Sequence, residues 1–173
     1  MGVTVEKVSD VTPELASGLA SLIPHLNESA PILDVDAFRA IVTQPGVHLL
    51  VARDGEARVV GTVTVVCFRI PSGRRARIES LVVAPTARRE GVGRALCEAA
   101  LECAQGHGAE TVDLTSGPAR MEANALYRSL GFTPRATNTY RMRIGDGHPA
   151  VAAEPGVAAV DHLGRFASSV ARR

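Results

Sequence analysis

The hydrophobic pattern of this chain changes its period at Pro85, and this change constrains the fold more than any other feature of the sequence. Residues 75–83 have the composition and the alternation of a strand. After Pro85 the apolar residues recur at helical spacing along one stripe, which consists of Val92, Ala95, Leu96, Ala99, Ala100 and Cys103. A strand that passes through a short turn into an amphipathic helix predicts a mixed α/β domain.

The rest of the chain adds further elements to this unit. Thr12 and Asp34 are typical helix N-caps, and Gly131 is typical of a helix end. We expect strands at 3–8, 47–52, 58–69, 75–83 and 110–115, helices from Pro13 to about Leu26, from Asp34 to Pro45, from Val92 to Gly106 and at 120–130, and a final strand or strand pair at 132–144. Residues 1–144 are therefore predicted to form one domain. Residues 145–173, rich in Gly, Ala and Pro, are predicted to be a tail that is disordered or forms one short helix.

The charge balance argues against nucleic acid and membranes as partners. The chain has 19 basic and 18 acidic side chains, for a net charge of +1, and it has no tryptophan. It also lacks an apolar run of transmembrane length and a leader with a basic and then an apolar segment, so we expect a cytoplasmic protein. Three cysteines without a CxxC pair predict neither a disulfide framework nor a structural zinc site.

The turn between the strand and the helix has the features of a local anion site. The first N–H groups and the positive dipole end of a helix attract a phosphate. Gly91 and Gly93 place no side chain between the backbone and a ligand, and Arg88, Arg89 and Arg94 add positive charge. The alternative interpretation is an ordinary strand-to-helix connection with incidental glycines. Neither the P-loop pattern nor the dinucleotide pattern G-x-G-x-x-G is present at this turn.

Two signatures in this region resemble those of the GNAT acetyltransferases. Residues 83–93 follow the pattern V-x-P-x-x-R-x-x-G-x-G, and residues 123–132 follow A-x-x-L-Y-x-x-x-G-F. The resemblance implies the GNAT fold, an α/β fold with a central mixed, twisted sheet of about six to seven strands flanked by about four helices. It also implies that the sheet is splayed between its fourth and fifth strands, here 75–83 and 110–115, and that acetyl-CoA is the co-substrate, with no metal.

The resemblance implies a set of residues that bind acetyl-CoA. The pantetheine arm would bond to the backbone of the strand end, and the diphosphate would lie on the N–H groups of 89–94. The implied residues are Leu81, Val82, Val83, Arg88, Arg89, Glu90, Gly91, Val92, Gly93, Arg94, Asn124 and Tyr127. The chain departs from the family pattern at Arg89, where many members have Gly, and at Arg120, where many have Asn.

The transfer reaction needs a proton for the leaving thiolate and a base for the attacking amine. Tyr127 matches the family tyrosine that acts as general acid, although a packed core tyrosine would give the same pattern. Glu79 is the candidate general base, because strand alternation places it on the same face as Leu81 and Val83. The alternative for Glu79 is a salt bridge to Arg75 or Arg77 on a solvated face. In the histone-modifying branch of the family the catalytic glutamate lies two residues earlier, where this chain has Arg77.

Two further residues, Asp113 and His107, are weaker candidates for the base. His107 lies between glycines at a predicted helix end, where a cationic side chain also fits as a cap.

The predicted function is direct transfer of the acetyl group of acetyl-CoA to a primary amine of a small molecule, through a ternary complex. One alternative is acetylation of a protein N-terminus or lysine. Another is a catalytically inactive module that binds CoA and regulates a partner. A homodimer is also left open. The substrate pocket is expected at 20–45 and 66–77.

Overall fold

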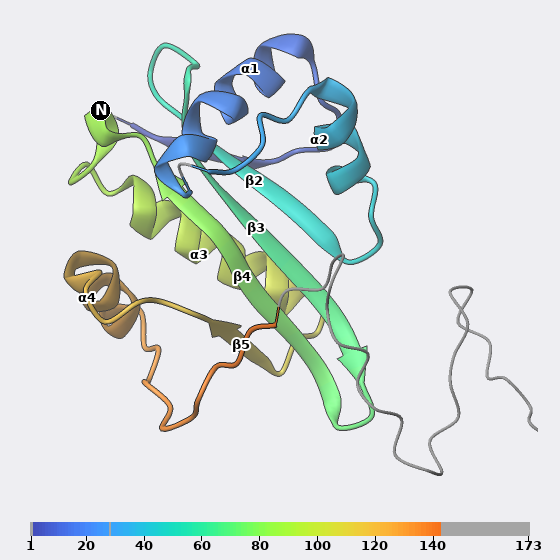
Figure 1. The fold of residues 1–173 in the computed structure, drawn as a ribbon, viewed down its shortest axis with the longest axis vertical. Helices are drawn as coiled ribbons and strands as arrows, with labels where there is room; N and C mark the ends of the chain where they lie inside the picture. The colour runs from blue at the N-terminus through green and yellow to red at the C-terminus, as the bar shows by residue number, and fades with distance from the viewer. Residues whose placement is uncertain (1, 28, 143–173) are drawn as a thin grey trace, which may run out of the picture. The chain divides into compact units, whose positions relative to one another are not determined.

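The computed structural model describes residues 2–27 and 29–142 of the chain (Figure 1). The chain divides into one unit of Met1–Thr133 and a second of Pro134–Arg173. The helices and strands of the described residues lie in the first unit: β1 (Thr4–Lys7), α1 (Pro13–Leu22), η1 (Ile23–His25), α2 (Val35–Val42), β2 (Val47–Arg53), β3 (Val59–Ile70), β4 (Gly73–Val83), η2 (Pro85–Ala87), α3 (Val92–Gly106), β5 (Thr111–Leu114) and α4 (Met121–Ser129). No helix in the described residues is both long and apolar enough to cross a membrane.

The two N-terminal helices begin at the predicted caps. The Thr12 hydroxyl accepts a hydrogen bond from the Leu15 N–H at 3.2 Å, and the Asp34 carboxylate accepts one from the Ala37 N–H at 2.8 Å. The first helix ends earlier than predicted, at Leu22, and a short 3-10 turn follows it. Pro24 explains the difference, because it lacks the N–H that another α-helical turn would need.

The five strands form one sheet in the order β1-β2-β3-β4-β5. Neighbouring strands are antiparallel from β1 to β4, and β5 is parallel to β4. A parallel neighbour needs a crossover connection, which α3 provides. The pairing between β4 and β5 covers only Arg75–Ile78 and Thr111–Leu114, so β4 continues from Glu79 to Val83 without β5 beside it.

Each face of the sheet has its own hydrophobic core. Helix α3 crosses behind β3 and β4 in Figure 1 and packs its apolar stripe on one face through Val92, Leu96, Ala100 and Ala104. On the other face α1 and α2 pack through Leu15, Leu19 and Phe38. The mixed α/β fold class that the sequence predicts is therefore confirmed.

A β-bulge interrupts β4 just before the end of the strand. Thr62 of β3 pairs with Val82, but Thr64 pairs with Glu79, so β4 has one residue more than β3 between these pairs. Ser80, inside the bulge, has a left-handed φ of 54°. Such an insertion reverses the side-chain alternation of the residues that follow it.

Because of this bulge, the predicted direction of the Glu79 side chain is wrong. Residues paired across two strands share a face of the sheet. Glu79 therefore lies on the face of its partner Thr64, whereas Val83 lies on the opposite face with its partner Gly61. Leu81 and Val83 pack against the core under α3. Simple alternation was wrong here, because the extra residue cannot be seen in the sequence.

The structure describes residues 132–142 of the final strand predicted at 132–144, and no strand forms there. Residues 132–142 contain no helix or strand, so among the described residues the sheet has five strands, where six to seven were predicted. Pro134 lacks a ladder donor, and residues 133–139 include few apolar side chains, which explains why this segment has weak strand character. Residues 143–144 and the predicted tail at 145–173 lie outside the described residues.

Candidate functional site

A cleft of about 820 Å³ lies where the end of β4, the N-terminus of α3 and helix α4 meet. Figure 1 shows α4 beside the start of α3, and side-chain contacts of Arg89 and Arg94 connect the turn and α3 to α4. The residues that line the cleft are His25, Leu81, Val82, Val83, Ala87, Arg88, Arg89, Gly91, Val92, Gly93, Arg94, Ala119, Arg120, Met121, Glu122, Ala123, Ala125, Leu126 and Tyr127. The cleft therefore brings together both sequence signatures.

The N-terminus of α3 presents backbone donors to this cleft. Gly91 is the N-cap, with a left-handed φ of 84°, and no side chain caps the helix. In the described part of the chain the N–H groups of Val92, Gly93 and Arg94 make no hydrogen bond to a backbone carbonyl or a side chain. Together with the helix dipole, three such donors have the chemistry to hold an anion.

The two glycines of this turn have different structural roles. A Cβ on Gly91 would meet nothing within 4 Å, so its positive φ, and not a lack of space, favours glycine. A Cβ on Gly93 would lie 3.4 Å from Cδ2 of Leu126 in α4. This is an ordinary van der Waals distance, so Gly93 lies against α4 but lack of space alone does not require glycine there.

Arginine side chains connect the turn and α3 to α4 through a hydrogen bond and a salt bridge. The Arg94 guanidinium donates to the Ser129 hydroxyl at 2.7 Å and lies 3.4 Å from Glu98. Arg89, whose φ is 69°, forms an exposed salt bridge with Glu122 of α4 at 2.8 Å. An exposed pair of this kind contributes little to stability, so a phosphate could replace Glu122 as the partner of Arg89 at low cost.

The edge of β4 from Glu79 to Val83 forms one wall of the cleft through Leu81, Val82 and Val83. On the side of β5 this edge has no strand partner among the described residues, since the pairing ends at Ile78. Unpaired backbone groups at a strand edge can bond an extended ligand that carries amides, as an added strand would.

Tyr127 faces the cleft from α4 and is the most deeply buried polar residue of its lining. Its ring meets that of Phe132 edge to face, with centroids 6.0 Å apart. Burial raises the pKa of the Tyr127 phenol above its ordinary value, Cys97 adds to the increase, and Arg120 opposes it. A raised pKa keeps the phenol protonated at neutral pH, which is the state that a general acid requires.

Three predicted site residues do not line the cleft: Glu79, Glu90 and Asn124. The side-chain amide of Asn124 donates to the Gly117 carbonyl at 2.9 Å and so holds the loop before α4. Glu79 is exposed and forms a salt bridge with Arg77 at 2.9 Å, which is the structural alternative that the sequence suggested. Its role as the general base stays a prediction.

His25 is a cleft residue that the sequence analysis did not single out, although it lies in the stretch 20–45 where the substrate pocket was expected. It belongs to η1, which contacts β4, and it lines the cleft together with Leu81 and Val82. No motif marks this histidine, because only the packing of η1 against β4 brings it to the site. Asp113 and His107, the weaker candidates for a base, do not line the cleft.

Comparisons with known proteins agree with both signatures. The sequence profile of the acetyltransferase (GNAT) family matches residues 17–132. A putative acetyltransferase from Agrobacterium tumefaciens has a similar solved structure, with a TM-score of 0.70 and 27% identity, over 81% of this chain and 99% of that one.

Two curated relatives are similar over part of the chain. Mycothiol acetyltransferase of Beutenbergia cavernae is 32% identical over 94 residues, which is 54% of this chain and 31% of the relative. N-acetyltransferase 8 of Homo sapiens is 32% identical over 99 residues, which is 56% of this chain and 43% of the relative. The chain thus spans less than half of the length of both relatives.

Proposed function

The chain belongs to the acetyltransferase (GNAT) family, and we propose that it transfers the acetyl group of acetyl-CoA to a primary amine of a small molecule. The observation that carries this proposal is the cleft itself. It has uncapped helix donors, suited to a diphosphate, and a buried tyrosine, suited to proton donation, on facing helices. Acetyl-CoA supplies the thioester that the amine attacks, and the chain supplies binding, orientation and proton transfer.

Binding of acetyl-CoA is assigned to two backbone features. The N–H groups at the start of α3 would hold the diphosphate, with Arg88 and Arg94 adding positive charge. The free edge of β4 near Leu81 and Val82 would bond the amides of the pantetheine arm. Main-chain groups recognise the shape and the amides of the arm, so these positions tolerate different side chains.

Tyr127 is assigned the role of general acid. Its burial keeps the phenol protonated, and it lines the same cleft as the start of α3, which allows it to reach a ligand there. The proton would pass from the phenol oxygen to the sulfur of the leaving thiolate.

Two residues are candidates for the base that accepts the amine proton. Glu79 is close in sequence to the strand end, but the bulge directs it away from the face of Leu81, and Arg77 pairs with it. His25 lines the cleft beside Leu81. Histidine is the side chain that serves most often as a general base, so we favour His25 over Glu79.

A small molecule is the favoured acyl acceptor because one curated relative is named for acetylation of the small molecule mycothiol. The test is release of CoA thiol from acetyl-CoA, measured over a panel of amino sugars, polyamines and amino-acid derivatives, with N-terminal and lysine peptides beside them. Turnover with at least one small amine, abolished or strongly reduced in Tyr127→Phe, is expected. Turnover with peptides alone would overturn the choice of acceptor. Tight CoA binding without turnover on any acceptor would instead favour the regulatory module.

A further inference from the structure

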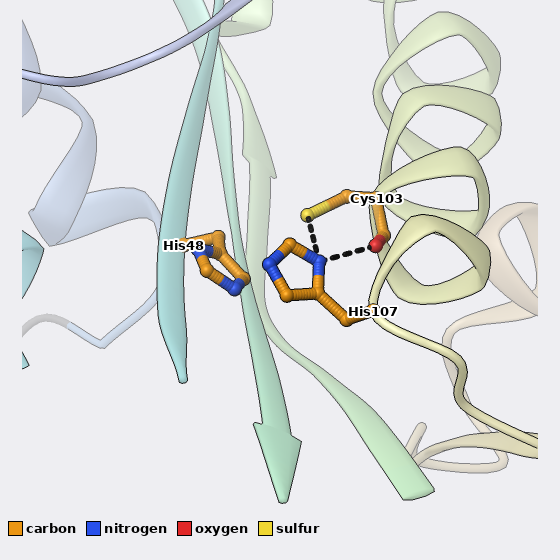
Figure 2. Close-up of side chains that lie close together, drawn as sticks. All are labelled: His48, Cys103 and His107. Atoms are coloured by element: carbon orange, nitrogen blue, oxygen red, sulfur yellow. Dashed lines mark hydrogen bonds between the residues drawn. The ribbon is translucent and has the colours of Figure 1, made fainter. Parts of the chain in front are cut away.

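Three side chains that commonly ligate metals meet at the end of α3 opposite the cleft. His48 belongs to β2, whereas Cys103 and His107 lie one helical turn apart at the C-terminal end of α3 (Figure 2). One ligand atom from each residue can be chosen so that all three lie within 4.8 Å of one another. At about 1.5 Å per helical residue, the cluster is roughly 15–20 Å from the anion site at Val92. It is therefore separate from the acetyltransferase cleft.

His48 is buried and its Nε2 atom has no partner. The side chain is 9% exposed, and Nε2 makes no hydrogen bond to any described group. A buried polar atom without a partner is unfavourable, and such atoms in native proteins usually mark a missing water, ion or ligand. Its ring centroid lies 4.1 Å from that of His107, so the unpaired nitrogen belongs to the cluster and not to an isolated pocket.

His107 is held in the tautomer that a metal ligand needs. Its Nδ1 lies 2.7 Å from the Cys103 carbonyl oxygen. A carbonyl can only accept, so Nδ1 carries the proton and Nε2 carries the lone pair. Figure 2 shows this second nitrogen directed toward His48. A histidine that donates one N–H to a backbone carbonyl and offers its other nitrogen is the usual arrangement at a metal.

We propose that His48, Cys103 and His107 form a Zn²⁺ site that fastens the end of α3 to strand β2. One thiolate and two neutral imidazoles are a ligand set that suits zinc. Ligand atoms around a tetrahedral zinc ion are about 3.3–3.6 Å apart, given bonds of about 2.0–2.3 Å. One ligand atom of each of the three residues already lies within 4.8 Å of the others, so small side-chain rotations are sufficient.

The charges around the cluster affect how it binds a metal ion. Burial raises the pKa of the Cys103 thiol, and the positive charge of Lys7 on β1 opposes this increase. This positive charge opposes a cation and favours the thiolate. Binding of Zn²⁺ therefore forms a zinc–sulfur bond and releases the thiol proton of Cys103 to solvent. The fourth position is free for water.

The experiment uses the full chain, freed of metal with a chelator and titrated with Zn²⁺ or Co²⁺ alone. Calorimetry should show binding of one Zn²⁺ that saturates below about 0.1 mM. Co²⁺ should give the charge-transfer absorption of a thiolate ligand, and Zn²⁺ should raise Tm, because a ligand of the folded state stabilises it. Zinc should also protect Cys103 from alkylation.

Matched variants connect these signals to the cluster. Cys103→Ala and His107→Gln should lose the binding and the rise in Tm, and Cys103→Ala should lose the cobalt band. Cys97→Ala removes a buried thiol of the same helix outside the cluster and should keep all three signals. The proposal is overturned if the folded wild-type chain binds no zinc in this range. Undiminished binding in the double variant of Cys103 and His107 would overturn it equally, since the metal would then be held elsewhere.

Discussion

The Gly91→Asp substitution tests the anion site most directly, because it places a negative charge at the uncapped start of α3. Gly91 is exposed and a Cβ there meets nothing within 4 Å, so the side chain fits without displacing a neighbour. Its carboxylate would lie beside the N–H groups of Val92, Gly93 and Arg94 and accept their hydrogen bonds. These are the donors that we assign to the diphosphate of acetyl-CoA.

The size of the effect follows from the charges. The two negative charges of a diphosphate, held about 6 Å from a carboxylate, repel it by about 1.4 kcal/mol even at the dielectric constant of water. This energy corresponds to about a tenfold loss of affinity, and competition for the N–H donors adds to it. We therefore expect the Kd for CoA to rise at least about tenfold, and less at high salt, where the repulsion is screened.

Gly91→Asn is the matched control for this charge. Asn and Asp have nearly the same size, and both tolerate the left-handed φ that Gly91 adopts. Calorimetric titration of CoA into both folded variants at low ionic strength separates backbone strain from charge. If Gly91→Asp binds CoA as tightly as Gly91→Asn and the wild type do, the diphosphate does not lie at this turn. An equal loss in both variants would refute the electrostatic reasoning.

Four further predictions concern catalysis and the thiols. Tyr127→Phe should keep CoA affinity but lower kcat roughly ten- to a thousandfold. Because burial raises the pKa of Tyr127, the wild-type kcat should fall only above about pH 10, where the phenol ionises, and an unchanged kcat in the variant would exclude this acid. His25→Gln should lower kcat/KM at pH 7 by about 10²–10⁴-fold, whereas Glu79→Gln should have little effect. The reverse result in this pair would identify Glu79 as the base. A chain ended after residue 146 should retain activity, because the family signatures lie before it, and a folded but inactive shortened chain would contradict this. Burial raises the pKa of the Cys97 thiol to about 11, so mass spectrometry should find Cys97 unalkylated in the folded protein near pH 8 and alkylated after unfolding, while modification of the native chain would show that α3 opens there.

Several elements of the fold could be predicted because their signals are local. The caps Thr12 and Asp34 determine where two helices begin, since the side-chain oxygen and its N–H partners are within one turn of each other. The apolar stripe after Val92 likewise predicts α3 and its buried face. The spacing of the two signatures predicted which residues would meet, and most of them do line one cleft.

Other features depend on contacts that no local pattern encodes. The bulge at Ser80, and with it the direction of Glu79, results from the register of β4 against β3. His25 reaches the cleft only because η1 packs on β4. The expectation of no zinc site rested on cysteine spacing along the chain, but the cluster joins His48 on a strand to Cys103 and His107 on a helix.

The sequence by itself therefore determined most of the helices and strands, the fold class and the strand-to-helix turn at 83–93, because hydrogen bonding and periodicity over a few residues are sufficient for each. The tertiary structure decided which side chains face the cleft and which donors gather around His48. Those outcomes depend on strand register and on the packing of α3 and η1 against the sheet, where residues far apart in sequence are brought within a few ångströms of one another.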